Sequence, residues 1–239
     1  MIDKIQKICG KIIEKYSKDQ NVLGILLFGS AARGKFDEFS DIDILILLTE
    51  KPEFARENFI IDGTRADIIL HPISDVRCYL RLEKFQVHRN FTHMIAHGKI
   101  IYEKTKDLEK IIQLSKKNLN MKTKYSSDEI LMHLYSIDDF FGGVQRAVKR
   151  KDIISYANNS YLMINNAIEL VLKKNGKYWL APDELSNLLS NYDKKILMLI
   201  QNFYQKSDLI SQLDVLAQIV KYVNNLTNGG LPQSWKTIE

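Results

Sequence analysis

The chain has 239 residues, of which 45% are hydrophobic and 26% are charged, with a formal net charge of +5. This composition is typical of a soluble globular protein, and no apolar run reaches the ~18 residues that a membrane-spanning helix needs. The two cysteines, Cys9 and Cys78, have no metal-type spacing. We therefore expect a reduced, cytoplasmic protein without a membrane partner and without a disulfide framework.

The first predicted elements are a helix and two strands. Residues 2–16 carry isoleucines at helical spacing with lysines between them, which predicts an amphipathic helix that covers a sheet. Residues 22–28 and 42–48 are apolar runs of strand length, rich in aliphatic residues. The first run ends at Gly29 and Ser30, where glycine permits close approach of a phosphate. We expect Ser30 to cap a following helix, whose amides would attract anions.

Two aspartates accompany the start of the second strand. Alternate residues of a strand point to the same face, so Asp41 and Asp43 are expected to project together, about 7 Å apart at Cα. Two like charges at such a distance favour cations between them. Hard carboxylate oxygens select Mg²⁺, with Mn²⁺ as the alternative. Two such ions about 4 Å apart can hold the attacking and leaving oxygens of an in-line displacement at phosphorus.

A third carboxylate is predicted on the next pair of strands. Residues 58–61 and 64–71 are strand-like, and Asp62 and Gly63 between them are a strong two-residue hairpin signal. In the second of these runs, Asp67 shares a face with Arg65 and Ile69. Three carboxylates on adjacent strands next to a Gly-Ser turn are hard to explain by stability alone, because they repel one another without a metal ion.

Three polar residues lie between the Gly-Ser turn and the aspartates. Arg33 and Lys35 are within reach of the turn, where a cation could neutralise a triphosphate; the alternative is a solvated surface charge. Ser40 immediately precedes Asp41 and could either contact a phosphate or cap a turn.

One further helix and one strand complete the first half of the chain. Residues 74–97 are predicted to form a single helix, and residues 100–102 a last short strand. Four histidines lie at positions 71, 88, 93 and 97. Only His93 and His97 have the i, i+4 spacing of a helical metal site, and no carboxylate motif accompanies them, so zinc is disfavoured.

The second half of the sequence is helical throughout. Apolar residues recur at steps of three and four over residues 130–148 and 153–171, after the start signals Ser126 and Asp152. Further helices are predicted from Pro182, over residues 196–203 and over residues 209–223. We divide the chain into a domain of residues 1–105 and a helical bundle of residues 106–239.

Gly29-Ser30, Asp41-x-Asp43 and Asp67 together resemble the DNA polymerase β-type nucleotidyltransferase superfamily over roughly residues 20–105. A catalytic half followed by a helical bundle also resembles the antibiotic nucleotidyltransferases of the kanamycin, streptomycin/spectinomycin and lincosamide types. The resemblance implies an α+β fold with a small mixed sheet. It also implies metal-dependent transfer of AMP from ATP to a hydroxyl of an antibiotic-like small molecule, with release of pyrophosphate.

The resemblance further implies roles for individual residues. The catalytic and metal-binding residues would be Asp41, Asp43 and Asp67, which hold two Mg²⁺ ions. The nucleotide-binding residues would be Gly29, Ser30, Arg33, Lys35 and Ser40. Bundle carboxylates act as general base in several such enzymes, and here the candidates are Glu169, Asp138 and Asp139. Related enzymes also bind substrates across two subunits, which makes the bundle a candidate surface for a homodimer.

The sequence also allows three alternatives to transfer of AMP to a small molecule. The chain could be a protein adenylyltransferase of toxin–antitoxin type, or a non-catalytic nucleotide-binding module. The complete carboxylate set argues against the module, because a sensor has little need of three acids. A role on RNA is disfavoured, because the chain is short for the modules that it requires and the net charge of +5 is modest.

Overall fold

The computed structural model describes residues 2–179 and 182–236, and the chain divides into two compact units. The first unit comprises residues up to 85 together with residues 89–121, and the second comprises residues 86–88 together with residues from 122 onward. The predicted division after residue 105 precedes the helix α5 (Asp107–Leu119), which belongs to the first unit. The reason is that Leu108 and Ile111 of this helix are buried with Leu26 and Leu45 of the sheet.

The first unit is built on a five-stranded mixed sheet with strand order β3-β4-β2-β1-β5. Strands β2 and β4 are parallel, and the other neighbouring pairs are antiparallel. The strands are β1 (Val22–Phe28), β2 (Ile42–Leu48), β3 (Arg56–Ile61), β4 (Thr64–Pro72) and β5 (Lys99–Glu103). The predicted α+β class and the predicted last strand are confirmed.

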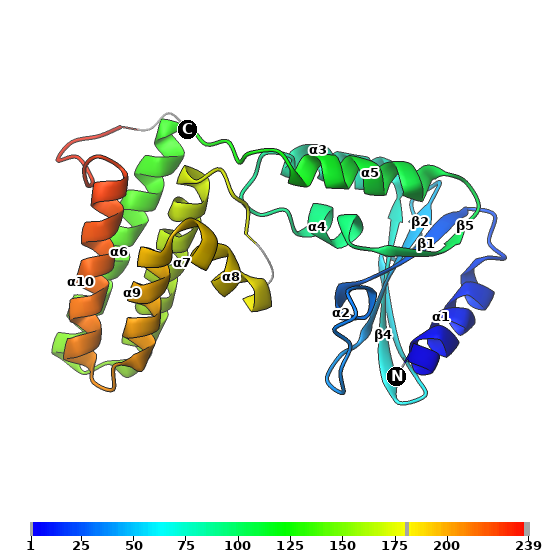
Figure 1. Cartoon of the computed structure of the whole chain (residues 1–239), viewed down its shortest axis with the longest axis horizontal. Coiled ribbons are helices and arrows are strands. Elements are labelled where there is room, and N and C mark those ends of the chain that lie inside the picture. Colours follow the sequence, from blue (N-terminus) through cyan, green and yellow to red (C-terminus); the bar gives the residue numbers. More distant parts are fainter. Residues whose placement is uncertain (1, 180–181, 237–239) are drawn as a thin grey trace. The chain divides into compact units, whose positions relative to one another are not determined.

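Helices cover both faces of this sheet (Figure 1). Helix α1 (Ile2–Tyr16) packs on one face, and α3 (Ile73–Glu83), α4 (Asn90–Ala96) and α5 pack on the other. Alternation along β2 sends Ile44 and Ile46 to the α1 side and Leu45 and Leu47 to the opposite side. Because every second residue of a strand faces the same way, Asp43 lies on the face of Leu45 and Leu47.

The predicted hairpin between β3 and β4 is confirmed. Asp62 and Gly63 both have positive φ, 49° and 73°, as a tight two-residue turn requires. The turn places Ile61 opposite Thr64 and fixes the antiparallel register of the two strands.

The predicted single helix over residues 74–97 is wrong. Helix α3 ends at Glu83 and α4 begins at Asn90, and the connection between them includes residues 86–88 of the second unit. Val87 is buried in the core of that unit, and its carbonyl accepts a hydrogen bond of 2.7 Å from the Trp179 amide. Packing of Val87 therefore overrides the helical pattern.

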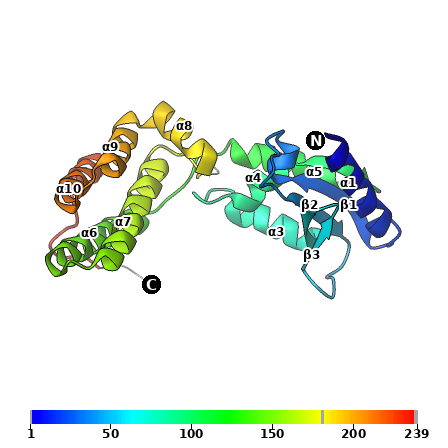
Figure 2. The same cartoon turned by 90° about the horizontal axis from the view of Figure 1, so that it is seen from below.

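The second unit is a bundle of helices, with α6, α7, α9 and α10 side by side (Figures 1 and 2). Its helices are α6 (Ser127–Arg150), α7 (Ile153–Lys174), α8 (Pro182–Tyr192), α9 (Lys194–Gln205) and α10 (Leu209–Leu226). Ser126 forms a capping box with Glu129 at the start of α6, and the Asp152 side chain accepts from the Ser155 amide at the start of α7. Over the described ranges, no helix combines the length and the apolar character needed to cross a membrane.

Candidate functional site

Three aspartates gather at the start of strands β2 and β4. The parallel register places Asp43 directly beside Asp67, and Asp41 lies one residue before β2. The pKa of Asp43 is raised to about 6, first by burial of the carboxyl and then by the negative charges of Asp41 and Asp67. The structure thus brings together the three carboxylates that the sequence singled out.

Gly29 lies against this cluster because the end of β1 pairs with the start of β2, where Phe28 is opposite Asp43. The φ of Gly29 is +67°, and a Cβ atom added there would lie 2.8 Å from Cγ of Asp43 and nearer still to Oδ2. Only glycine therefore satisfies both the backbone and the space at residue 29. The close approach that we expected toward a phosphate is made toward a carboxylate.

The expected capping role of Ser30 is wrong. The short helix α2 (Gly29–Ala32) begins at Gly29 and has Phe28 as its N-cap, with no side-chain capping bond. Ser30 lies inside this single turn, and its carbonyl accepts a hydrogen bond of 2.9 Å from the Lys35 amide. The helix starts directly at the end of the strand, two residues before the position that the sequence suggested.

Of the other predicted nucleotide-binding residues, Arg33 and Lys35 follow this turn, whereas Ser40 belongs to a separate turn at Asp37. Arg33 follows α2, and its positive charge lowers the pKa of Asp43, so it acts on the carboxylate cluster. The Ser40 hydroxyl donates to Oδ1 of Asp37 at 2.7 Å and accepts from the Asp37 amide at 3.1 Å. These are the contacts of a turn cap, the alternative that the sequence had left open.

Arg56 is a site residue that the sequence reading missed. Its Nε donates to Oδ1 of Asp67 at 2.8 Å, and its NH2 group contacts Oδ2. Arg56 lies on the edge strand β3, diagonally across from Asp67 on β4. The signal was present in the sequence, because the two-residue turn fixes the register that brings these side chains to one face.

A pocket of about 580 Å³ adjoins the carboxylate cluster. Asp41 is part of its lining, and so is the Phe39 side chain, which is 89% exposed. The other lining residues are Lys4, Phe36, Asp37, Glu38, Ser40, Gly63, Thr64 and Arg65. Aromatic, cationic and carboxylate groups thus meet in one hollow beside Asp41.

The carboxylate oxygens of this cluster are its possible metal ligands. Among the described residues, no group of three or more His, Cys, Asp and Glu side chains is arranged to hold a metal ion. Asp67 contacts Arg56 with both carboxylate oxygens, which leaves Asp41 and Asp43 as the ligands for an ion. Burial and then repulsion by Asp41 and Asp67 raise the pKa of Asp43, and a divalent cation would relieve that repulsion. The pair therefore fits Mg²⁺ or Mn²⁺.

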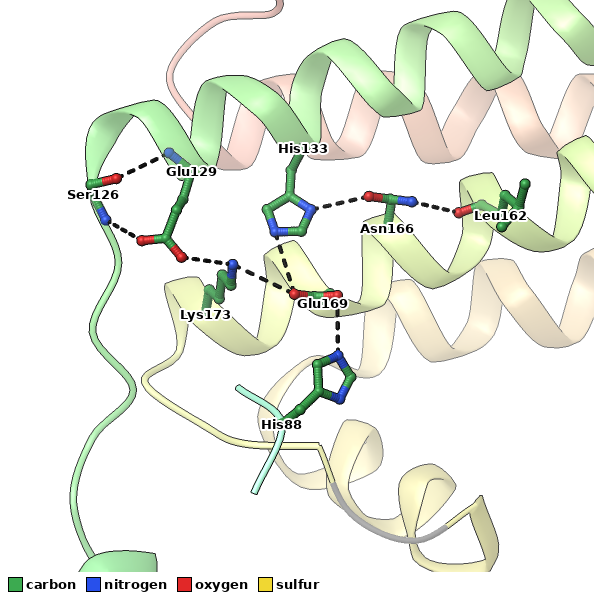
Figure 3. Close-up of polar contacts among 8 residues, drawn as sticks. All are labelled: His88, Ser126, Glu129, His133, Leu162, Asn166, Glu169 and Lys173. Atoms are coloured by element: carbon green, nitrogen blue, oxygen red, sulfur yellow. Dashed lines mark hydrogen bonds and ion pairs between the residues drawn. The ribbon is translucent and has the colours of Figure 1, made fainter. Parts of the chain in front are cut away.

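Glu169, the predicted general base, belongs to a polar network inside the second unit (Figure 3). Its Oε2 lies 3.3 Å from Nε2 of His88, and its Oε1 lies 3.6 Å from Nε2 of His133 and 3.5 Å from Nζ of Lys173. The hydrogen bond with His88 and the nearby cationic groups lower the pKa of Glu169. A carboxylate with a lowered pKa is a weaker base than a solvated glutamate. Asp138 and Asp139, the other candidates, are exposed on α6.

The remaining contacts of this network define the state of His133. Nδ2 of Asn166 donates to the Leu162 carbonyl at 2.9 Å, which turns Oδ1 of Asn166 toward Nδ1 of His133 at 3.2 Å. Burial and the charge of Lys173 lower the pKa of His133, which favours the neutral ring.

A pocket of about 550 Å³ opens onto these side chains. His133, Glu169 and Lys173 are in its lining. The other lining residues are Ser126, Asp128, Glu129, Met132, Ser136 and Asn166. Three carboxylates against one lysine give this pocket a negative balance.

Comparison with known proteins identifies the class to which this site belongs. Residues 10–107 match the family model described as polymerase beta, nucleotidyltransferase. The chain is 36% identical over 74 residues, 26% of its own length and 75% of the relative's, to the Methanocaldococcus jannaschii protein named "Putative protein adenylyltransferase". The chain therefore belongs to the polymerase β-type nucleotidyltransferase family, and it is a nucleotidyltransferase.

A solved structure shares the fold. The crystal structure of a nucleotidyltransferase-like protein from Exiguobacterium sibiricum 255-15 matches with a TM-score of 0.54 and 12% sequence identity. The match covers 91% of this chain and 73% of that one. At this identity the likeness shows the fold alone, and it supports the sequence of a mixed-sheet unit followed by helices.

Proposed function

We propose that this nucleotidyltransferase transfers AMP from ATP to a hydroxyl group and releases pyrophosphate. The observation that carries the proposal is the carboxylate pair Asp41 and Asp43 beside Gly29, where burial and then the like charges of Asp41 and Asp67 raise the pKa of Asp43. Half-buried carboxylates that repel each other at the end of a tight turn favour binding of a nucleotide-bound cation. Family membership supplies the reaction class.

The proposed roles follow from the positions of the residues. When bound, divalent ions neutralise the phosphates and lower the pKa of the acceptor hydroxyl. Asp41 and Asp43 would hold these ions, and the turn at Gly29 and Ser30 would receive the β- and γ-phosphates. Arg33 adds positive charge on the side of the leaving pyrophosphate, as does Lys35.

The transfer step itself exchanges one bond at phosphorus for another. The acceptor oxygen forms a bond to the α-phosphorus while the bond from that phosphorus to the bridging oxygen of pyrophosphate breaks. The proton of the acceptor hydroxyl passes to a carboxylate. We assign this role to Asp67, which the parallel register places beside Asp43 and which must first leave its two-point contact with Arg56. Glu169 is the second candidate, and its hydrogen bond with His88 lowers its pKa.

For the acceptor, we propose a hydroxylated small molecule of the antibiotic type. The support is the pocket of the second unit, whose volume of about 550 Å³ is of the size that small ligands occupy. Its lining of Asp128, Glu129, Glu169 and Ser136 offers acceptors to amines and hydroxyls.

A second acceptor class is favoured by a different observation. The Methanocaldococcus jannaschii relative, 36% identical over 74 residues, is named a protein adenylyltransferase. By that analogy the acceptor would be a hydroxyl of a Tyr, Ser or Thr side chain on a partner protein.

One experiment tests the transfer and separates the acceptors. The protein is incubated with Mg²⁺ and ATP labelled at the α-phosphate, first with aminoglycosides and lincosamides and then with proteins from a cell extract. Label that migrates with a small molecule on thin-layer plates supports the first acceptor, and label on a protein band supports the second. If neither a small molecule nor a protein becomes labelled and no pyrophosphate is formed, adenylyl transfer is refuted. An Asp43→Asn variant is the control for catalysis by this site.

A further inference from the structure

The third carboxylate of the cluster is engaged by an arginine of the same unit. Arg56 and Asp67 form a two-point contact, from Nε to Oδ1 at 2.8 Å and from NH2 to Oδ2. A guanidinium group in this geometry uses both oxygens of a carboxylate at once. The Asp67 side chain is 13% exposed, whereas that of Arg56 is 63% exposed.

We propose that Arg56 competes with a divalent ion for Asp67, so that the arginine sets how many ions the cluster holds. This inference rests on the proposed function, in which Asp41 and Asp43 hold an ion. With Arg56 in place, Asp67 has its negative charge balanced and both oxygens engaged, and the site takes one ion. When Arg56 leaves, Asp67 becomes a ligand beside Asp43 and the cluster takes a second ion.

The position of Arg56 makes such an exchange physically accessible. Arg56 is at the start of the edge strand β3, and most of its side chain faces solvent, so it can move without opening the core. Its replacement by a divalent ion raises the positive charge beside Asp43, whose pKa Arg56 already lowers. Guanidinium and metal ion therefore serve the same electrostatic role at one carboxylate.

A purely structural role for this ion pair explains less. Strands β3 and β4 are already joined by the turn at Asp62 and Gly63 and by an antiparallel ladder over the length of β3. Because the Arg56 side chain is 63% exposed, solvent screens this ion pair, which is expected to add only about 1 kcal/mol to stability. The turn and the ladder therefore hold the hairpin without the ion pair between Arg56 and Asp67.

The test is a Mn²⁺ titration followed by electron paramagnetic resonance of the free ion, at about pH 8, where Asp43 is ionised. We expect one bound ion for the wild type and a second ion for Arg56→Gln, with an affinity at least about tenfold above any second site of the wild type. Arg65→Gln is the matched control, because Arg65 is an exposed arginine on the Asp67 side of β4. It removes the same charge and is expected to keep one ion.

The double variant Arg56→Gln/Asp67→Asn locates the second ion, which we expect to be lost again. Thermal unfolding provides a second readout, with a larger stabilisation by Mn²⁺ in Arg56→Gln than in wild type or Arg65→Gln. The same ion count in wild type and Arg56→Gln would overturn the role of Arg56, as would a second ion that persists without Asp67. Absence of any Mn²⁺ binding to the wild type would instead refute the metal site of the proposed function.

Discussion

The α-carbon of Gly29 lies so close to the carboxylate of Asp43 that no side chain fits at position 29. An added Cβ would be 2.8 Å from Cγ of Asp43. The tight turn after β1 and the acid on β2 therefore form one structural unit. A change at the turn must move the acid.

This relationship predicts the result of Gly29→Ala. The substitution strains a residue with φ of +67° and displaces Asp43, so we expect transfer to fall by about 10²-fold or more, since small misplacements of reacting groups have such effects. Gly34→Ala is the matched control, because Gly34 has φ of +75° but nothing within 4 Å of an added Cβ. Gly34→Ala should lose roughly 1 kcal/mol of stability from its positive φ, and Gly29→Ala should lose more, because its methyl group also overlaps with Asp43. Equal activity of the two, measured by pyrophosphate release, would contradict the argument.

Asp43→Asn should separate stability from catalysis. Loss of a carboxylate ligand is expected to reduce transfer by about 10³-fold or more. In metal-free buffer at neutral pH the variant should be as stable as wild type or more stable, because it removes a buried charge that Asp41 and Asp67 repel. Asp62→Asn, in the exposed hairpin, is the control and should keep full transfer. Circular dichroism and pyrophosphate release measure the two effects, and undiminished turnover of Asp43→Asn would rule out the assignment.

The raised pKa of Asp43 also predicts a pH dependence of stability in the metal-free protein. The pKa rises from 3.8 to about 6 on folding, so the native state binds more protons than the unfolded state between these values. Stability from this group is then greatest below about pH 4 and falls as the pH rises to about 6. Other carboxylates titrate in the same range, so the useful quantity is the difference in unfolding free energy between wild type and Asp43→Asn. Urea denaturation in the presence of EDTA should show this difference moving against wild type up to about pH 6 and levelling above it; a flat difference would show that Asp43 is not perturbed.

Much of the first unit could be predicted because its patterns are local. Alternation along β2 and β4 placed Asp43 and Asp67 on one face, and the turn at Asp62 and Gly63 set the register of the hairpin. The same register also places Arg56 diagonally across from Asp67, which the sequence analysis missed. The contact between Arg56 and Asp67 follows only from the residue-by-residue register of β3 and β4.

Other features could not be found because they depend on which surfaces meet. Val87 fits the apolar stripe of a helix, yet it is buried in the second unit, and a periodic pattern does not say which core a residue joins. His88 contacts Glu169 from a position 81 residues earlier in the chain, and no spacing rule links them. The sequence placed Glu169 off the apolar face of its helix, but the partners that lower its pKa come from tertiary packing.

Lys173 forms ion pairs with two carboxylates of the polar network in the second unit. Its side chain is 7% exposed, and Nζ lies 3.1 Å from Oε1 of Glu129 and 3.5 Å from Oε1 of Glu169. Lys173→Met leaves both carboxylates without this cation, and we expect a loss of about 2 kcal/mol. That is less than the ~3–5 kcal/mol of a fully buried pair, because Glu129 is 43% exposed.

Tryptophan fluorescence reports the unfolding of the second unit. Both tryptophans of the chain, Trp179 and Trp235, belong to the second unit, so their fluorescence during urea denaturation reports the unit that contains Lys173. Lys149→Met, in the exposed last turn of α6, is the control and should change stability by less than about 0.5 kcal/mol. Adding Glu129→Gln to Lys173→Met should recover part of the loss, because it removes one of the two uncompensated charges. A loss of the same size in Lys149→Met, or no recovery in the double variant, would show that the ion pairs of Lys173 do not stabilise the bundle.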